Sequence, residues 1–274
     1  MAGLKEKIGV IGAGKIGSAI LQGVIRAGLV GKEEAIASAP REQVRRHLAK
    51  EIGVRVTGDN GEVCEFADIV ILAVKPQVVQ PVLEGVARKL GKEKLLVSVA
   101  AGVPTRKIEA CLERGARVVR VMTNTPCVVG AAASAYAPGS HATRVDMEKV
   151  GRILQSVGIA LPLEEHHLDA VTGLGGSGPA FVFLFIEALA DGGVQVGLAR
   201  DVALKLALQT VYGSAKMALD SGKHLSQLKD EVTSPGGTTI AGLYALEKGG
   251  MRGTVMEAVL QATLRSRALG KGES

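Results

Sequence analysis

A chain of 274 residues, 47% of them hydrophobic, can bury one large core or two smaller ones, which excludes a disordered protein. Lysines and arginines number 33 against 27 aspartates and glutamates, and the resulting net charge of +6 is too small to indicate a nucleic-acid partner. Four phenylalanines, three tyrosines and no tryptophan leave little aromatic surface for stacking bases.

The part of the chain up to residue 162 alternates short β-branched runs with amphipathic stretches, such as the helical pattern over 77–90. This alternation is typical of βαβ units in a doubly wound parallel sheet. Nearly continuous hydrophobicity indicates strands covered on both faces. We expect strands at 8–11, 35–38, 54–56, 69–74, 95–99 and 118–122, with further short ones near 132–137 and 160–163. The pattern predicts an α/β fold with a Rossmann-type dinucleotide-binding domain over residues 1–162.

A glycine-rich turn follows the first expected strand and opens a helical stretch over 18–27. Its residues match Gly-x-Gly-x-x-Gly and are Gly12, Ala13, Gly14, Lys15, Ile16 and Gly17. The first glycine makes a tight turn, the second lets the backbone approach a pyrophosphate, and the third lets the helix pack closely on the strand. The motif alone also fits an ordinary strand-to-helix turn, but its place at the first strand of a βαβ series favours dinucleotide binding.

The end of the second expected strand is where a carboxylate would hold the ribose of NAD. Glu33 and Glu34 precede that strand, so they are not placed for this contact. Ser38 and Arg41 follow it instead, and a hydroxyl with a guanidinium fits a 2′-phosphate. This favours NADPH, with NADH possible, although Arg41 fits equally a solvated helix face shared with the arginines at 45 and 46.

Small and turn-forming residues follow the fourth and fifth expected strands, at the sheet edge where α/β folds bind ligands. These residues are Ala73, Val74, Lys75, Pro76, Ala100, Ala101 and Gly102, and we expect the nicotinamide to pass them. The sequence favours a structural role over an acid role for Lys75. Asn60, in a Gly-Asp-Asn-Gly segment, fits a turn residue and an adenosine contact equally well.

The chain changes character after residue 163, where strand patterns give way to long alanine- and leucine-rich stretches separated by glycine. Helices are expected at 179–190, 199–220, 238–247 and 253–269. These predict an all-helical second domain over 163–274, without a flexible linker before it.

A glycine-rich loop precedes the first of these helices and resembles the substrate-domain motif of the β-hydroxyacid dehydrogenases. In that motif a lysine and an asparagine follow the glycines, whereas Val182 and Ile186 stand at those positions here. Neither side chain can take the proton of an alcohol, which argues against hydroxyacid oxidation. We expect the loop to bring backbone close to a cofactor or substrate.

A second polar turn, Ser-Pro-Gly-Gly-Thr-Thr, opens the helix expected at 238–247. Hydroxyls of Ser234, Thr238 and Thr239 flank it, and exposed N–H groups of the helix start converge on the same place. The arrangement fits a carboxylate cradle, but serine and threonine before a helix more often only cap it.

Other classes of site find no support in the sequence. His166 and His167 lack a partner at helical spacing, so no metal site is expected. Three well-separated cysteines form no disulfide framework and fit a reducing compartment. The start of the chain shows no secretion signal, and the apolar stretch at 179–190 is shorter than the roughly 20 residues of a membrane span, so we expect a cytoplasmic protein.

Residues 215–243, AKMALDSGKHLSQLKDEVTSPGGTTIAGL, resemble the C-terminal signature of the Δ1-pyrroline-5-carboxylate reductase family. The resemblance covers nearly the whole chain, through 11–17, 74–76, 97–102, 120–126, 171–180 and 187–198. Two departures stand out. Gly175 replaces the serine usual in Gly-Leu-Ser-Gly-Ser-Gly-Pro-Ala, and Leu225 and Ser226 replace the usual Pro-Gly after His224.

The resemblance implies an oxidoreductase that reduces a cyclic imine with NAD(P)H in the last step of proline biosynthesis. A C=N bond is already an electrophile, so hydride transfer needs orientation and a hydrogen bond to the ring nitrogen more than a strong base. By the family motif, Thr239 would be catalytic through the ring nitrogen, and Ser234, Gly237 and Thr238 would hold the carboxylate. The cofactor residues implied are 12–17, Ser38, Asn60, 73–76 and 100–102.

The resemblance also implies a homodimer that assembles into a larger homo-oligomer, with a decamer expected. Charge, aromatic content and the length of the apolar stretches give no reason to expect a nucleic-acid or membrane partner. Two alternatives stay open. One is a β-hydroxyacid dehydrogenase-like enzyme or another imine reductase, and the other is a non-catalytic NADP-sensing protein.

Overall fold

The computed structural model describes residues 3–271 of the chain. They form two compact units, one made of residues 3–177 with 260–271 and the other of Gly178–Val259. The boundary between these compact units follows Ser177, whereas the sequence predicts a functional division after residue 162. That functional division therefore stays a prediction.

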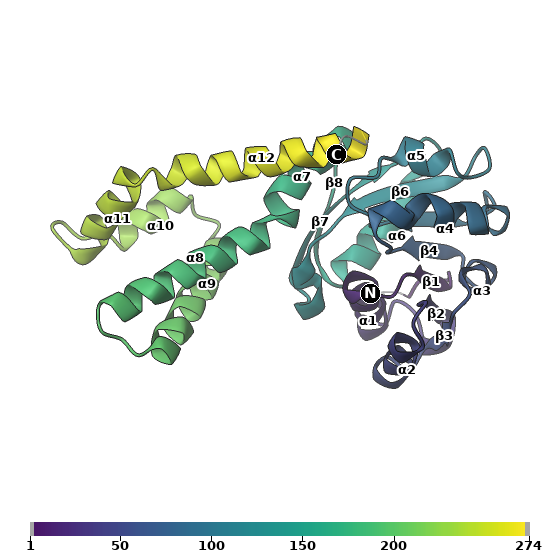
Figure 1. Cartoon of the computed structure of the whole chain (residues 1–274), viewed down its shortest axis with the longest axis horizontal. Helices are drawn as coiled ribbons and strands as arrows, with labels where there is room; N and C mark the ends of the chain where they lie inside the picture. Colours follow the sequence, from purple (N-terminus) through teal and green to yellow (C-terminus); the bar gives the residue numbers. More distant parts are fainter. Residues whose placement is uncertain (1–2, 272–274) are drawn as a thin grey trace. The chain divides into compact units, whose positions relative to one another are not determined.

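The first unit is built on one eight-stranded sheet with the order β3-β2-β1-β4-β5-β6-β7-β8 (Figure 1). Neighbouring strands are parallel, except that β6 and β7 are antiparallel. The strand order reverses between β1 and β4, and the carboxyl edge beside such a reversal is where doubly wound folds bind ligands. The strands are β1 Ile8–Ile11, β2 Ala35–Ser38, β3 Arg55–Thr57, β4 Ile69–Leu72, β5 Leu95–Ser98, β6 Arg117–Met122, β7 Ala132–Pro138 and β8 Gly158–Pro162.

Helices cover both faces of this sheet and create two hydrophobic layers. Side chains of β4 alternate between the layers: Ile69 and Ile71 join the core under α1, α2 and α6, while Val70 and Leu72 join the core under α3, α4 and α5. The helices are α1 Lys15–Arg26, α2 Glu42–Glu51, α3 Asn60–Phe66, α4 Val79–Val86, α5 Thr105–Glu109, α6 Arg144–Gln155 and α7 Leu168–Val171. The predicted α/β fold with a Rossmann-type sheet is confirmed.

Two local predictions for this unit need correction. The helix expected over 77–90 is divided into a 3₁₀ turn at Pro76–Val78, the α-helix α4 and a second 3₁₀ turn at Ala87–Lys89. Pro76 and Pro81 both lack an N–H donor, and proline is tolerated only in a first turn, so the α-helix begins anew at Val79. The expected fourth strand ends at Leu72 rather than at residue 74, because the chain there enters the turn before Pro76.

The second unit is helical, and no strand follows β8 among the described residues. Small alanines let α8 and α9 pack closely, around Ile186, Ala190, Ala203 and Ala207. The helices are α8 Gly178–Gln195, α9 Arg200–Ser221, α10 Leu225–Glu231, α11 Thr238–Lys248 and α12 Met251–Lys271, and residues of α12 from Leu260 onward belong to the first unit. The expected all-helical C-terminal part is confirmed.

The second unit exposes many large apolar side chains for so small a core. Phe183 is 63% exposed, Tyr212 63% and Leu219 83%. Apolar surface on this scale marks an interaction surface. The helical run Glu165–Gln195 also has the length and composition of a membrane span, a criterion that helices of soluble proteins meet as well.

Candidate active site

The Gly12–Gly17 turn lies where β1 passes into α1, beside the end of β4. Gly12 has a φ of +85°, and a Cβ atom there would lie 2.6 Å from Cγ1 of Val74 and 3.0 Å from the oxygen of Ala73. A Cβ on Gly17 would lie 2.9 Å from the oxygen of Gly12. Both positions therefore require glycine. A Cβ on Gly14 would meet no protein atom within 4 Å, so the turn leaves open space at its second glycine.

The start of α1 offers backbone donors to that open space. Gly14 is the N-cap residue and no side chain caps the helix, while the N–H groups of Gly12 and Ala13 are already bonded to the oxygen of Ser38. The first N–H groups of a helix have no partner within it, and its dipole places partial positive charge there. An open position beside such donors fits a dinucleotide pyrophosphate.

The end of β2 brings two predicted residues together. Ser38 is buried and its hydroxyl donates to Oδ1 of Asn60 over 2.6 Å. Asn60 opens α3, whose first turn is capped by the Asp59 carboxylate accepting from the N–H of Gly61. The two side chains therefore form one polar corner beside the glycine turn of β1.

Three arginines follow β2, one at the N-cap of α2 and two within α2, and they have different roles. Arg45 donates from Nη1 to the oxygens of Ala39 and Pro40, at 2.8 and 2.9 Å, so it holds the loop rather than facing solvent as the sequence suggested. Arg46 pairs with Glu42 on the surface of α2. Arg41 is exposed at the N-cap of α2 and pairs with no acid among residues 3–271, which leaves its guanidinium free for a ligand.

A cavity of about 1050 Å³ opens at the carboxyl ends of β4 and β5. It is lined by the predicted residues Pro76, Ala101 and Gly102, by the segment after α7, and by the last turns of α12. The sequence did not predict that α12 lines this cavity, because a position near the end of a helix gives no sequence signal for contact with a distant strand end. Lys75 lies exposed beside this edge.

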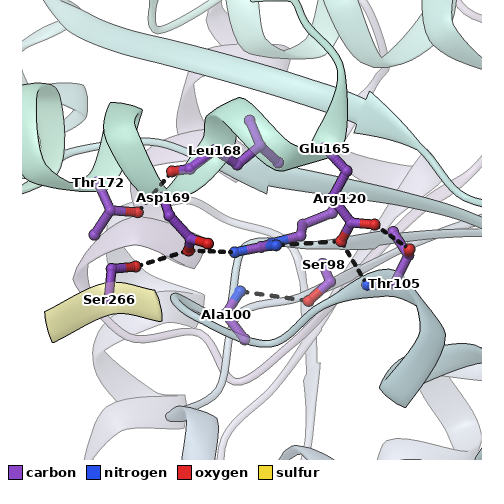
Figure 2. A network of polar contacts seen from close by, with 9 residues as sticks. All are labelled: Ser98, Ala100, Thr105, Arg120, Glu165, Leu168, Asp169, Thr172 and Ser266. Carbon is purple, nitrogen blue, oxygen red and sulfur yellow. Dashed lines mark hydrogen bonds and ion pairs between the residues drawn. The ribbon is translucent and has the colours of Figure 1, made fainter. Parts of the chain in front are cut away.

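A network of polar contacts borders the cavity (Figure 2). Arg120 of β6 is 5% exposed and donates from Nη1 to Glu165 over 3.1 Å and from Nη2 to Asp169 over 3.4 Å. Glu165 also accepts from the N–H and the hydroxyl of Thr105, at 2.7 and 2.6 Å. Asp169 accepts from the hydroxyl of Ser266 over 2.9 Å. One guanidinium thus connects the sheet with α5, α7 and α12.

The electrostatics of this network favour the ionised form of Glu165. Burial raises the pKa of its carboxyl, but the hydrogen bonds from Thr105 and the charge of Arg120 outweigh burial, so the pKa lies below its ordinary value of 4.5.

The glycine-rich segment after α7 forms a π-helical turn, Thr172–Gly176, held from the sheet side by Asn124. The Asn124 amide donates to the oxygen of Gly175 over 2.9 Å, and its oxygen accepts from the N–H of Ala133 over 3.0 Å. Thr172 and Ser177 line the cavity. The segment thereby brings backbone and hydroxyls to the cleft.

The Ser-Pro-Gly-Gly-Thr-Thr turn lies in the second unit, at the start of α11. Gly236 has a φ of +68°, and Gly237 is the N-cap with no side-chain cap. The hydroxyls of Ser234, Thr238 and Thr239 have no hydrogen-bond partner among the described residues. None of these hydroxyls therefore caps α11, contrary to the capping role that the sequence also allowed. The hydroxyls and the first N–H groups of α11 are available to an anion.

Metal chemistry finds no support among residues 3–271, where no group of three or more histidines, cysteines, aspartates or glutamates is placed to hold an ion. His166 pairs with Glu164 on the surface, and its ring lies against the ring of His167. Burial raises the pKa of the Cys64 thiol to about 11, so it is inert at neutral pH.

The chain is similar to known proteins over nearly its whole length. Residues 165–269 match the family described as pyrroline-5-carboxylate reductase dimerisation, and residues 7–102 match NADP oxidoreductase coenzyme F420-dependent. Pyrroline-5-carboxylate reductase of Methanosarcina acetivorans is 50% identical, over 97% of this chain and 98% of that protein. The chain belongs to the pyrroline-5-carboxylate reductase family. The enzyme of that name from Pisum sativum is 48% identical over 96% of this chain and 95% of its own.

A solved family member shows the same fold. Pyrroline carboxylate reductase of Plasmodium falciparum with NADP bound has a TM-score of 0.88 and 36% identity, covering 98% of this chain and 100% of that one. Within the family pattern, the departure at Gly175 is sterically neutral, because a Cβ there would meet only Cγ1 of Val171, at 4.0 Å.

The network around Arg120 predicts how stability depends on pH. Because folding lowers the pKa of Glu165, its ionised form stabilises the folded state above about pH 4.5, and this contribution is lost as the pH falls through the folded value. Replacing Glu165→Gln lowers Tm at neutral pH, and the difference from wild type shrinks on acidification. Thermal unfolding from about pH 7 to about pH 3 tests this; a difference that stays constant over that range would contradict it.

Proposed function

We propose that this chain reduces Δ1-pyrroline-5-carboxylate to L-proline with NADPH, the last step of proline biosynthesis. The observation that carries the proposal is that an open glycine turn at the start of α1 and an uncapped hydroxyl turn at the start of α11 occur in one chain of this family. The first suits a dinucleotide and the second suits a small carboxylate.

The geometry of the first unit supports the proposed cofactor residues. N–H groups at the start of α1 bind the pyrophosphate over Gly14, and the Ser38–Asn60 corner borders the adenosine ribose. Arg41 pairs with the 2′-phosphate. The nicotinamide lies along residues 73–76 and 100–102 at the cavity. When bound, NADPH supplies the hydride.

The substrate residues come from the turn at 234–239. The Ser234 hydroxyl and the N–H groups of Gly237 and Thr238 bind the carboxylate, which fixes the ring. Thr239 is a half-buried residue in the first turn of α11, and its hydroxyl hydrogen-bonds the ring nitrogen and orients the C=N bond. No side chain has to abstract a proton from carbon or oxygen, because the C=N bond is itself electrophilic, and this agrees with Val182 and Ile186 in place of a lysine and an asparagine.

The apolar helices of the second unit support the proposed assembly. The match to a dimerisation family over 165–269 supports a homodimer whose contacts cover the exposed apolar side chains. We further propose a larger homo-oligomer, with a decamer as its size, in the cytoplasm and away from membranes. The functional division that goes with it is a dinucleotide-binding domain at 1–162 and a dimerisation and substrate domain at 163–274.

The glycine turn gives a matched pair of variants. Gly14→Ala adds a methyl group where no protein atom lies within 4 Å, so Tm stays unchanged while NADPH binding weakens. Gly17→Ala forces a contact at 2.9 Å with the oxygen of Gly12, so Tm falls. Thermal unfolding and NADPH titration separate the two effects. If the Gly14→Ala protein bound NADPH as tightly as wild type, the pyrophosphate would not bind at Gly14.

Coenzyme choice is tested at Arg41. Arg41→Ala loses a charge-assisted contact to the 2′-phosphate, so it weakens NADPH about tenfold or more and leaves NADH nearly unchanged. The matched control is Arg46→Ala, because Arg46 is an exposed arginine of the same helix already paired with Glu42. Equal losses for both coenzymes in Arg41→Ala would contradict the assignment.

The role of Thr239 is tested by steady-state kinetics with the imine and NADPH. Thr239→Ala removes the hydrogen bond to the ring nitrogen and lowers kcat/KM about tenfold or more. Thr239→Ser keeps the hydroxyl and retains most of the activity. An unchanged rate in Thr239→Ala would exclude Thr239 from the reaction, and a wild-type protein that binds NADPH without reducing the imine would indicate a sensor instead.

A further inference from the structure

The last turns of α12 form a wall of the cavity at the end of β5. A Cβ atom on Gly270 would lie 3.1 Å from the oxygen of Gly102, and a Cβ atom on Gly102 would lie 3.8 Å from Cβ of Leu269. Gly102 has a φ of +72°, so the loop turns sharply where the helix touches it. The position of this loop therefore depends on where the end of α12 is held.

A buried hydroxyl in the last turns of α12 links this helix to the network around Arg120. Ser266 is 4% exposed and donates to Oδ1 of Asp169, the same oxygen that accepts from Nη2 of Arg120. Because Arg120 extends from the sheet, the hydroxyl connects α12 to the sheet through one carboxylate (Figure 2). A shared acceptor makes the two hydrogen bonds interdependent.

The same network fixes two other parts of the cavity. Glu165 binds the N–H and the hydroxyl of Thr105, three residues after Gly102, which holds the far end of the loop that leaves β5. Asp169 lies in α7, directly before the segment that carries Thr172 and Ser177 into the cavity. Three walls of the cavity therefore share Arg120 as their common anchor.

We propose that Arg120, Asp169 and Ser266 are positioning residues for hydride transfer, which set the loop at 100–102 against the nicotinamide by holding the end of α12. The proposal rests on the proposed function. Transfer rates depend steeply on the placement of the reacting atoms, so a small displacement of this wall slows the chemical step more than it weakens cofactor binding. Most cofactor contacts, at the glycine turn and the end of β2, lie outside this network.

A second arginine of β6 supplies the matched control. Arg117 donates from Nη1 to Asp146 over 2.7 Å, and Asp146 is fully buried in α6. This ion pair lies at the amino end of β6, and neither residue lines the cavity. A variant that weakens the Arg117–Asp146 ion pair therefore loses stability but leaves the walls of the cavity unchanged.

The experiment compares Ser266→Ala, Asp169→Asn and Arg117→Lys with wild type, leaving Arg120 intact because its removal would leave two partly buried acids without their cation. We measure kcat, the KM values, the NADPH dissociation constant, Tm and the kinetic isotope effect with NADPH deuterated at the transferred position. Ser266→Ala and Asp169→Asn lower kcat about fivefold or more and raise the isotope effect, with NADPH affinity within about twofold. Arg117→Lys lowers Tm and leaves the kinetic values unchanged. Ser266→Thr keeps the hydroxyl and has the kcat of wild type.

Wild-type kcat and isotope effect in both Ser266→Ala and Asp169→Asn would overturn the proposal, whatever happens to Tm. A second readout does not depend on turnover: amide hydrogen exchange at 100–103 and 262–270 rises in both variants and stays unchanged in Arg117→Lys. Unchanged exchange in Ser266→Ala and Asp169→Asn would overturn the anchoring even if the wild-type protein failed to reduce the imine. Failure of the wild-type protein in that assay would count against the proposed function alone.

Discussion

The close approach of the Gly12–Gly17 turn to the end of β4 is the constraint on which the cofactor site depends. Space for a Cβ atom is missing at Gly12 and Gly17, so the backbone itself makes the contact that seats α1 beside the strand reversal. Gly14 differs, because the space beside it is empty of protein. A ligand phosphate can then reach the N–H groups of α1 directly, and the other proposed cofactor contacts lie where the neighbouring strands end.

Ion pairs around Arg120 hold together the segments that border the cavity. Arg120 is buried and bonds two carboxylates, which come from segments far from β6 in the sequence. Buried ion pairs contribute little net stability compared with apolar packing, so their value here is geometric. The network fixes the loop after β5, the segment after α7 and the end of α12 around one cavity.

The sequence predicts the features that are local, and misses those created by distant contacts. The strands and the glycine turn are predictable because burial on both faces and the Gly-x-Gly-x-x-Gly spacing are written in neighbouring residues. Arg45 looks like a solvated helix residue until the fold brings the oxygens of Ala39 and Pro40 to it. Ser266 gives no signal at all, because its partner Asp169 lies 97 positions away in the chain. The antiparallel β7 and the division of the 77–90 helix also depend on context that periodicity does not carry.

Transfer of hydrogen from the cofactor to the imine carbon is the central claim, and it can be followed directly. Incubating the protein with Δ1-pyrroline-5-carboxylate and NADPH deuterated at the transferable position of C4, followed by mass spectrometry of the product, tests it in one step. The account predicts proline that carries the deuterium at the former imine carbon, formed in equal amount to the NADP produced. Absence of proline, or proline without the label, would contradict it.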